Sequence, residues 1–418
     1  MNSSKSGFGG WLTDNCYMFF SVLAFLSFYY GIPDIIRLSI LLLVFLINLR
    51  YVKRGNINSV VIFYILAAFF SLTGYLIRPY PPVFFVTVFY WSYMPIIFYF
   101  VGTRSHEDYP VFYRRSLWAF MFIFIVGFYF LLFPTERYVS KTLEILNLHS
   151  GHNEETYMYA RFASFLDSYH TSNLGVCSLC FGFGLARIGS NGKTITKVIA
   201  YLAIVVSLIT IMMAQQRVAM FVGVFLLVYF LLSGKGGKHT GSLLLTMLII
   251  GVSLVLVVGV MDTFGLAEVL LSEISQRFSS DSTSSMVSIR THQWVEAING
   301  FFQEPLFGLG IGSGGHLAVG VNMHPSVADG SYFKILLEGG LASFIPFIII
   351  LVSSLIKGFK QRKKYYVEFP LLFFFSCSMI GANVIDMPYI IMFMWYIMGR
   401  INSNRSRKQI AVNNNGQQ

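Results

Sequence analysis

Arg217, Arg290 and His324 carry the residue types that could do chemistry in this hydrophobic chain. Arg217 stands in MMAQQRVAM between two apolar runs, and Arg290 and His324 lie in a long hydrophilic segment. A charge near a bilayer costs free energy and marks a functional position. Guanidinium groups bind pyrophosphate oxygens in pairs, and a nearby histidine or carboxylate can accept a hydroxyl proton. The predicted catalytic residues are Arg217, Arg290, His324 and Asp329.

Six further side chains are predicted to bind the substrate around this site. Arg290 and Trp294 occupy positions i and i+4 of a predicted amphipathic helix, so they share one face. The stretch RFASFLDSYHTSNLG, just before an apolar run, concentrates polar residues and predicts a second wall of the same site. The substrate-binding candidates are Arg161, Arg277, His170, Trp294, Glu338 and Tyr332.

Each candidate also has a structural interpretation. The alternative for Arg217 is an arginine that snorkels to the membrane interface. The alternatives for Arg290 and His324 are a salt-bridge partner and a solvated loop histidine. Glu338 would then stabilise the entrance of its helix, and the polar residues around His170 would cap a helix at the interface.

Other motifs are less specific. GLGIGSGG (308–315) resembles a phosphate-binding loop but lacks its GK[ST] ending, so we expect a flexible turn that lets the backbone approach a substrate. The outer carboxylates form no DxD pair, and we expect no metal and no other cofactor. Cys177 and Cys180 form a CxxC in an apolar run without a second ligand pair, which favours packing over zinc or redox chemistry.

The composition indicates a polytopic membrane protein. The 418 residues are 55% hydrophobic and 12% charged, with a mean hydropathy of +0.65, which excludes a soluble domain. We expect an all-α transmembrane bundle of about twelve helices, since a span needs roughly 20 apolar residues. The expected spans are 16–32, 35–49, 58–77, 83–101, 116–134, 171–187, 196–215, 217–233, 242–262, 332–356, 369–386 and 388–400.

The basic residues predict the orientation of this bundle. Most of the 30 Lys and Arg residues fall in connections, such as 357–364 and 400–408, that are cytoplasmic when the N-terminus is inside. The net charge of +11 is therefore a topology signal, and we expect no nucleic-acid partner. Both termini are predicted to be cytoplasmic.

The predicted organisation is a single integral membrane domain over 1–418. Its extracytoplasmic connections include a first loop over 135–170 and a large loop over 263–330 that carries the active site and short helices. The segment 403–418 is polar and is predicted to be a disordered cytoplasmic tail.

Taken together, these motifs resemble the O-antigen polymerase and O-antigen ligase superfamily of bacterial inner-membrane proteins. RTHQW (290–294), PLFGLGIG (305–312) and DGSYFKILLEGG (329–340) are similar to its R-x-x-x-W motif, its Pro-Leu and glycine stretch, and its sequence leading to L-x-x-L-x-E-x-G. QQRVAM resembles the family's arginine at a periplasmic helix end, and RFASFLDSYHTSNLG its short arginine-led motif. The resemblance covers roughly 160–345, and the earlier helices match in hydropathy alone.

The resemblance implies a metal-independent glycosyltransferase at the periplasmic face. Arg217 and Arg290 would meet the pyrophosphate of an undecaprenyl-pyrophosphate-linked oligosaccharide, and His324 or Asp329 would deprotonate the acceptor hydroxyl. The other implied partners are membrane lipid and a chain-length regulator protein. The ligase branch keeps a histidine where this chain has Asp329 and Gly330, which favours the polymerase branch.

Two alternatives remain. A ligase would transfer the glycan to a lipid A core or to a protein. A polysaccharide or small-molecule transporter would instead gather polar residues at the membrane midplane in broken, repeated helices.

Overall fold

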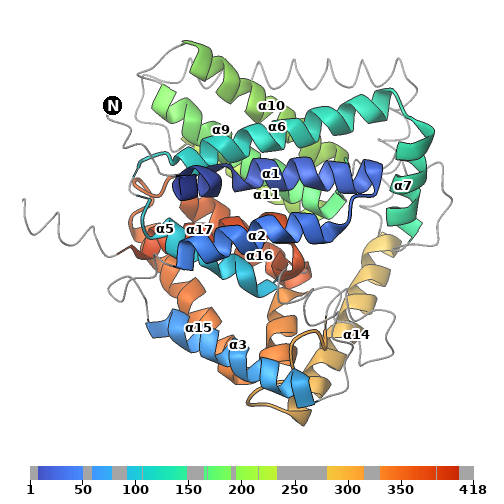
Figure 1. Cartoon of the computed structure of the whole chain (residues 1–418), viewed down its shortest axis with the longest axis vertical. Helices are drawn as coiled ribbons and strands as arrows, with labels where there is room; N and C mark the ends of the chain where they lie inside the picture. The colour runs from blue at the N-terminus through green and yellow to red at the C-terminus, as the bar shows by residue number, and fades with distance from the viewer. Residues whose placement is uncertain are drawn as a thin grey trace, which may run out of the picture. The chain divides into compact units, whose positions relative to one another are not determined.

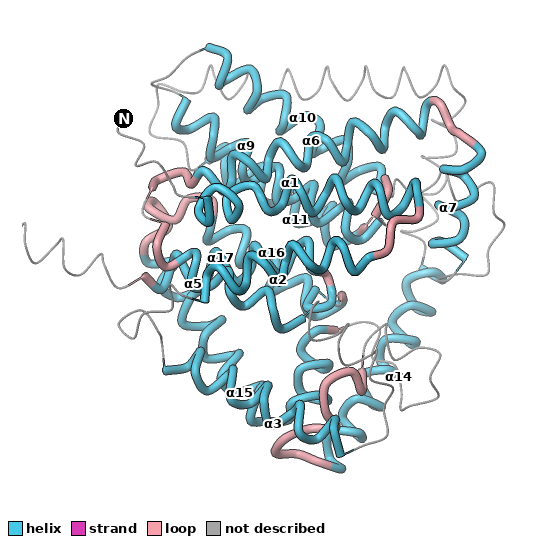
Figure 2. The backbone as a smooth tube through the Cα atoms, viewed as in Figure 1, coloured by secondary structure: helices cyan, strands magenta, loops and turns pink. Residues whose placement is uncertain are grey.

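The computed structural model describes residues 8–49, 59–77, 92–105, 107–147, 164–166, 168–189, 194–214, 216–232, 280–314, 330–382 and 384–403. Within these ranges 85% of the residues are helical and none lies in a strand (Figures 1 and 2). The predicted all-α class is confirmed. The chain divides into two compact units, which we call the C-terminal unit (Met1–Gly9, Leu41–Asp108 and Met286–Gln418) and the middle unit (Gly10–Ile40 and Tyr109–Ser285).

The middle unit is built around a close pair of apolar helices. A Cβ at Gly175 would lie 2.8 Å from Ile211 Cγ1, and one at Gly182 would lie 2.9 Å from Ile204 Cγ1, so these glycines let α9 and α10 approach closely. The helices of this unit are α1 (Phe8–Tyr30), α6 (Val111–Leu132), α7 (Glu136–Asn147), α9 (Ser168–Gly189), α10 (Thr194–Ala214) and α11 (Arg217–Leu232). Helix α2 (Asp34–Leu49) contributes residues to both units.

The C-terminal unit has α17 as its core. Every residue of α17 from Pro388 to Ile401 is buried. A Cβ at Gly399 would collide with the carbonyl of Tyr99, so glycine permits the crossing of α17 and α5. The other elements are α3 (Ser59–Ile77), η3 (Met94–Ile96), α5 (Ile97–Gly102), α14 (Ser280–Gln303, from Met286 onward), α15 (Ser331–Lys360), α16 (Glu368–Gly381) and η5 (Val384–Asp386), with α17 at Pro388–Asn402.

A buried ion pair fixes the C-terminal end of α17. Arg400 Nε lies 2.9 Å from Glu368 Oε1, and these side chains are 6% and 2% exposed. The Arg400 guanidinium also donates to Ser105 Oγ and to the Glu107 carbonyl, each at 2.9 Å. Because a buried charge is tolerated only when it is paired and hydrogen-bonded, this cluster joins α16, α17 and the 103–107 connection as a structural unit.

Three described helices are long and apolar enough to cross a membrane: Val111–Leu132, Thr194–Ala214 and Ser331–Lys360. Shorter apolar stretches lie in α2, α3, α11 and α16. At 1.5 Å per residue, a helix of about 15 residues is only about 22 Å long, against about 30 Å for a hydrocarbon core. Three helices of the described residues could therefore cross a membrane, and the predicted total of about twelve stays a prediction.

Each predicted span that the structure describes, in whole or in part, contains helical residues, while the span 242–262 lies outside the described residues. Both predicted outer loops contain a helix: α7 lies within 135–170, and α14 begins within 263–330. Of the predicted tail, residues 404–418 lie outside the described residues.

Candidate functional site

Helix α15 is broken at Gly340, and the glycine segment, residues 304–314, fills the break. Gly340 has φ 56° and ψ −161°, a conformation that only glycine adopts without strain. Backbone amides of α15 after Gly340 donate to carbonyls of the glycine segment. Backbone amides of the glycine segment donate to carbonyls of α15 before Gly340. These bonds run from Leu341 to Pro305 (2.9 Å), Ala342 to Leu306 (3.0 Å), Leu309 to Leu337 (2.8 Å) and Gly310 to Glu338 (3.0 Å). The backbone groups that the break deprives of helical partners therefore form hydrogen bonds with the glycine segment instead.

Replacing Gly340 by alanine is expected to destabilise the protein severely. The added Cβ would lie 2.5 Å from the Leu306 carbonyl oxygen, in a backbone conformation that rejects a side chain. Strain and clash together should cost at least about 3 kcal/mol, measured as thermal unfolding of the detergent-purified protein. Gly31 is the matched control: its φ is +73° and a Cβ there would meet nothing within 4 Å among the described residues, so Gly31→Ala should cost only about 1 kcal/mol. A wild-type melting temperature for Gly340→Ala would contradict the break.

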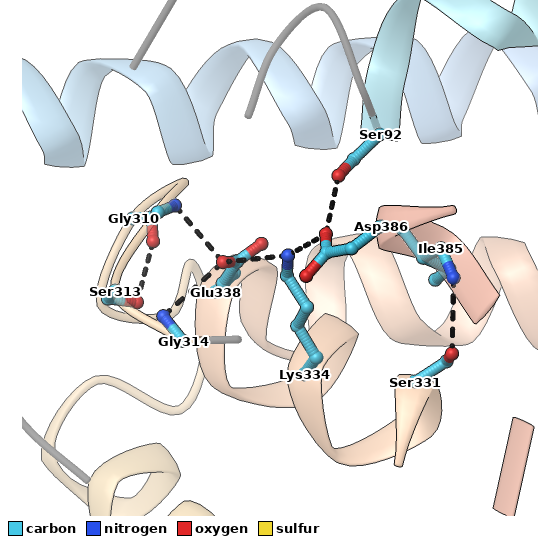
Figure 3. A network of polar contacts seen from close by, with 10 residues as sticks. Ser92, Gly310, Ser313, Gly314, Ser331, Lys334, Glu338, Ile385 and Asp386 are labelled. Carbon is cyan, nitrogen blue, oxygen red and sulfur yellow. Dashed lines mark hydrogen bonds and ion pairs between the residues drawn. The ribbon is translucent and has the colours of Figure 1, made fainter. Parts of the chain in front are cut away.

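The Glu338 carboxylate holds the glycine segment against α15. Its Oε1 accepts the amide of Gly312 at 3.1 Å. The same oxygen accepts the amide of Gly314 at 3.3 Å (Figure 3). The side chain is 2% exposed. We predicted that the backbone of this segment approaches a substrate, but in the structure these two amides are taken by an internal carboxylate. The sequence predicted that Glu338 binds substrate or stabilises the entrance of its helix. In the structure Glu338 lies within α15, two positions before the break at Gly340, and its carboxylate accepts the amides of the glycine segment.

Lys334 joins Glu338 to a second acid. Its Nζ lies 3.6 Å from Glu338 Oε1 and forms an ion pair and hydrogen bond with Asp386 Oδ1, which also accepts the hydroxyl of Ser92 at 2.8 Å. Lys334 is 1% exposed and Asp386 8%. Figure 3 shows the chain of contacts from the glycine segment through Lys334 to Asp386. One ammonium thus serves two carboxylates from different segments, and removing it would leave like charges buried together.

Ser331 ties the start of α15 to the connection after α16. Its hydroxyl donates to the Ala382 carbonyl at 3.0 Å and accepts the amide of Ile385 at 3.3 Å. Its own amide also donates to the Ala382 carbonyl, at 3.2 Å. The connection that carries Asp386 is therefore fastened to α15 at both Ser331 and Lys334.

Arg290 and Trp294 lie close to the place where the start of α15 meets the end of α16. The Trp294 ring stacks on Phe333 with centroids 5.1 Å apart and an angle of 16° between the planes. A Cβ at Gly381, the last residue of α16, would lie 3.6 Å from Arg290 Nη1. The guanidinium therefore rests near a helix C-terminus, where a cation is favoured. The predicted helix through Arg290 and Trp294 is present as part of α14, and both side chains are half-buried.

Tyr332, predicted to bind substrate, donates its hydroxyl to the Ser376 carbonyl of α16 at 3.0 Å. That bond gives the phenol a packing role between α15 and α16. In the structure Tyr332 therefore links α15 to α16.

The other described candidates belong to the middle unit. Arg217 begins α11, and His170 lies in the first turn of α9; both are half-buried. Between them, Gln216 Oε1 accepts the Ser172 hydroxyl and the Asn173 amide, the latter at 3.4 Å. The start of α11 is therefore bound to the first turns of α9, which brings together the two motifs around 170 and 217.

Arg161, Arg277, His324 and Asp329 lie outside the described residues. The predicted convergence of Arg217 with Arg290 links residues of different compact units and stays a prediction. Within the described ranges no group of three His, Cys, Asp or Glu residues could hold a metal ion.

Sequence reasoning missed Lys334, Asp386 and Ser92. A signal existed for the first two. Lys334 stands four residues before Glu338 in an otherwise apolar helix start, and Asp386 ends an apolar run without a nearby cation. A charge in such a position needs a partner, and each of these residues is the other's partner.

No protein-family model matches the chain, and a search of curated proteins found no match.

Proposed function

We propose that this chain is an O-antigen polymerase: a membrane glycosyltransferase that joins undecaprenyl-pyrophosphate-linked oligosaccharide repeat units. The supporting observation is the convergence of three separate motifs in one compact unit. The RTHQW motif reaches α15 through the Trp294–Phe333 ring stack, and the glycine segment reaches it through Glu338. Each motif alone is a loose indication of function, and the contacts of two of them with α15 make the combination more specific.

The proposed reaction is a direct displacement. Arg217 and Arg290 bind the donor's pyrophosphate, because guanidinium donors match pairs of phosphate oxygens. His324 takes the proton of the acceptor sugar hydroxyl, with Asp329 orienting it. The hydroxyl oxygen forms the new bond to the anomeric carbon as the bond to the pyrophosphate oxygen breaks. The leaving pyrophosphate keeps the electron pair, and the arginines stabilise its charge. The anomeric centre is inverted.

The proposal places the protein in a bacterial inner membrane, with both termini cytoplasmic and the site at the periplasmic face. Membrane lipid surrounds it, and a chain-length regulator protein is a proposed partner. The support is the excess of Lys and Arg in connections expected inside.

Cysteine labelling tests this orientation. In a variant whose four native cysteines are replaced, cysteines at Ser150 and Ser284 should react with an impermeant thiol reagent added outside intact cells. A cysteine at Ser403 should react only after the membrane is permeabilised. Labelling of position 403 in intact cells would reverse the orientation and move the site to the cytoplasm.

The function itself is tested by product length. A deletion strain should carry surface polysaccharide of single repeat units, and the purified protein should convert lipid-linked repeat units into longer chains. Complete loss of surface glycan, with no elongation by purified protein, would favour the ligase that acts on a lipid A core or a protein.

One observation favours a transporter as second candidate: α15 is a broken helix, as in many transporters. Here, however, the glycine segment fills the break and Lys334 is paired with two acids. Uptake or efflux of glycan by proteoliposomes that form no new glycosidic bond would establish transport instead.

A further inference from the structure

Lys334 connects the glycine segment to the connection after α16. Through Glu338 it reaches the amides of Gly312 and Gly314, and through Asp386 it reaches the turn between α16 and α17. The side chains of Lys334, Glu338 and Asp386 are 1%, 2% and 8% exposed, so solvent screens the attraction between their charges only weakly.

Arg290 lies close to the same turn. A Cβ added at Gly381 would lie 3.6 Å from Arg290 Nη1, so the guanidinium lies near this glycine. The carbonyl of the next residue, Ala382, accepts a hydrogen bond from the Ser331 hydroxyl at the start of α15. Trp294, one helical turn after Arg290, stacks on Phe333, the neighbour of Lys334. A shift of the α16–α17 turn or of the first turns of α15 would therefore move the surroundings of Arg290.

We infer that Lys334 and Asp386 are positioning residues that hold Arg290 in place for the donor's pyrophosphate. The inference rests on the proposed function of Arg290. The pair acts without touching the substrate: it fixes the turn against which the guanidinium lies. Because a misplacement of about 1 Å can cost about 100-fold in rate, even a small relaxation of this turn should be measurable.

Asp386→Asn is the most informative variant. The amide oxygen can still accept from Ser92 and Lys334, but the attraction between full charges is lost. We expect about a tenfold weaker binding of undecaprenyl pyrophosphate to protein in lipid nanodiscs, which corresponds to about 1.4 kcal/mol. Lys334→Met removes the cation between two carboxylates and should weaken binding further.

A double-mutant cycle separates positioning from general damage. In an Arg290→Ala background, Asp386→Asn should change pyrophosphate binding by less than about twofold, because the residue that it positions is absent. Full additivity, with the same tenfold loss in both backgrounds, would overturn the inference. Unchanged binding by Asp386→Asn in the wild-type background would overturn it as well.

The buried pair of Arg400 and Glu368 provides the matched control. It lies in the same unit but at the other end of α17. Glu368→Gln should lower the melting temperature about as much as Asp386→Asn while leaving pyrophosphate binding intact. If Glu368→Gln weakens binding equally, the effect is loss of stability and the inference fails.

The binding cycle does not require turnover, so it stands apart from the proposed function. If purified protein binds undecaprenyl pyrophosphate and the cycle shows coupling, but no repeat units are joined, the polymerase proposal fails and the positioning role survives. If repeat units are joined but the cycle is additive, the positioning role fails alone.

Discussion

Arg217→Ala and Arg290→Ala should each abolish chain extension while the protein still inserts and folds. Each variant loses a charge-assisted, bidentate contact to the departing pyrophosphate, which is worth about 2–4 kcal/mol in the transition state, or about 10²–10³-fold in rate. The measurement is elongation of purified lipid-linked repeat units at equal protein concentration. Arg290 also lies against the end of α16, so its variant must first be shown to melt at the wild-type temperature.

Lysine substitutions and a control arginine sharpen this test. Lysine keeps the charge but loses the planar pair of donors, so Arg217→Lys and Arg290→Lys should recover only part of the rate. Arg362, whose guanidinium lies over the Phe359 ring in a connection predicted to be cytoplasmic, is the control, and Arg362→Ala should elongate normally. Near-normal polymer from either alanine variant at 217 or 290 would refute the pyrophosphate role.

The sequence predicted the helices well because hydrophobic runs are a local signal. It placed α9, α10, α11 and α15 within a few residues of their observed positions. It assigned Trp294 and Glu338 to one substrate-binding site, and in the structure Trp294 stacks on Phe333, which belongs to the helix that contains Glu338.

The break at Gly340 could not be read from hydropathy, because the apolar run continues across it. A second glycine beside Glu338 is compatible with a continuous helix, and only the docking of Pro305 and Leu306 on the freed amides explains the observed break. The pairing of Lys334 with Asp386 spans 52 positions of sequence, and a local pattern does not specify such a partner. These tertiary contacts also decide which backbone amides remain free for a substrate. The amides of Gly312 and Gly314 donate to the Glu338 carboxylate.

The second large effect is expected on removal of the general base of the proposed reaction. His324→Ala should lower the elongation rate by about 10²–10⁴-fold, because general-base assistance contributes that much when the acceptor hydroxyl must lose its proton. An imidazole titrates near neutral pH and accepts a proton directly, whereas an aspartate is a weak base unless burial raises its pKa. Asp329→Asn should therefore have the smaller effect.

The two variants are compared with the same purified lipid-linked repeat units, with rates measured across pH 5 to 9. The wild-type rate should rise as the pH passes the pKa of His324, because the neutral imidazole is the active form, and this rise should be absent in His324→Ala. If His324→Ala keeps full activity while Asp329→Asn loses it, the roles are reversed. If both remain active, neither is the base. His170, in the first turn of α9, then becomes the next candidate. Glu338 is a weaker substitute, because two backbone amides and Lys334 already engage its carboxylate.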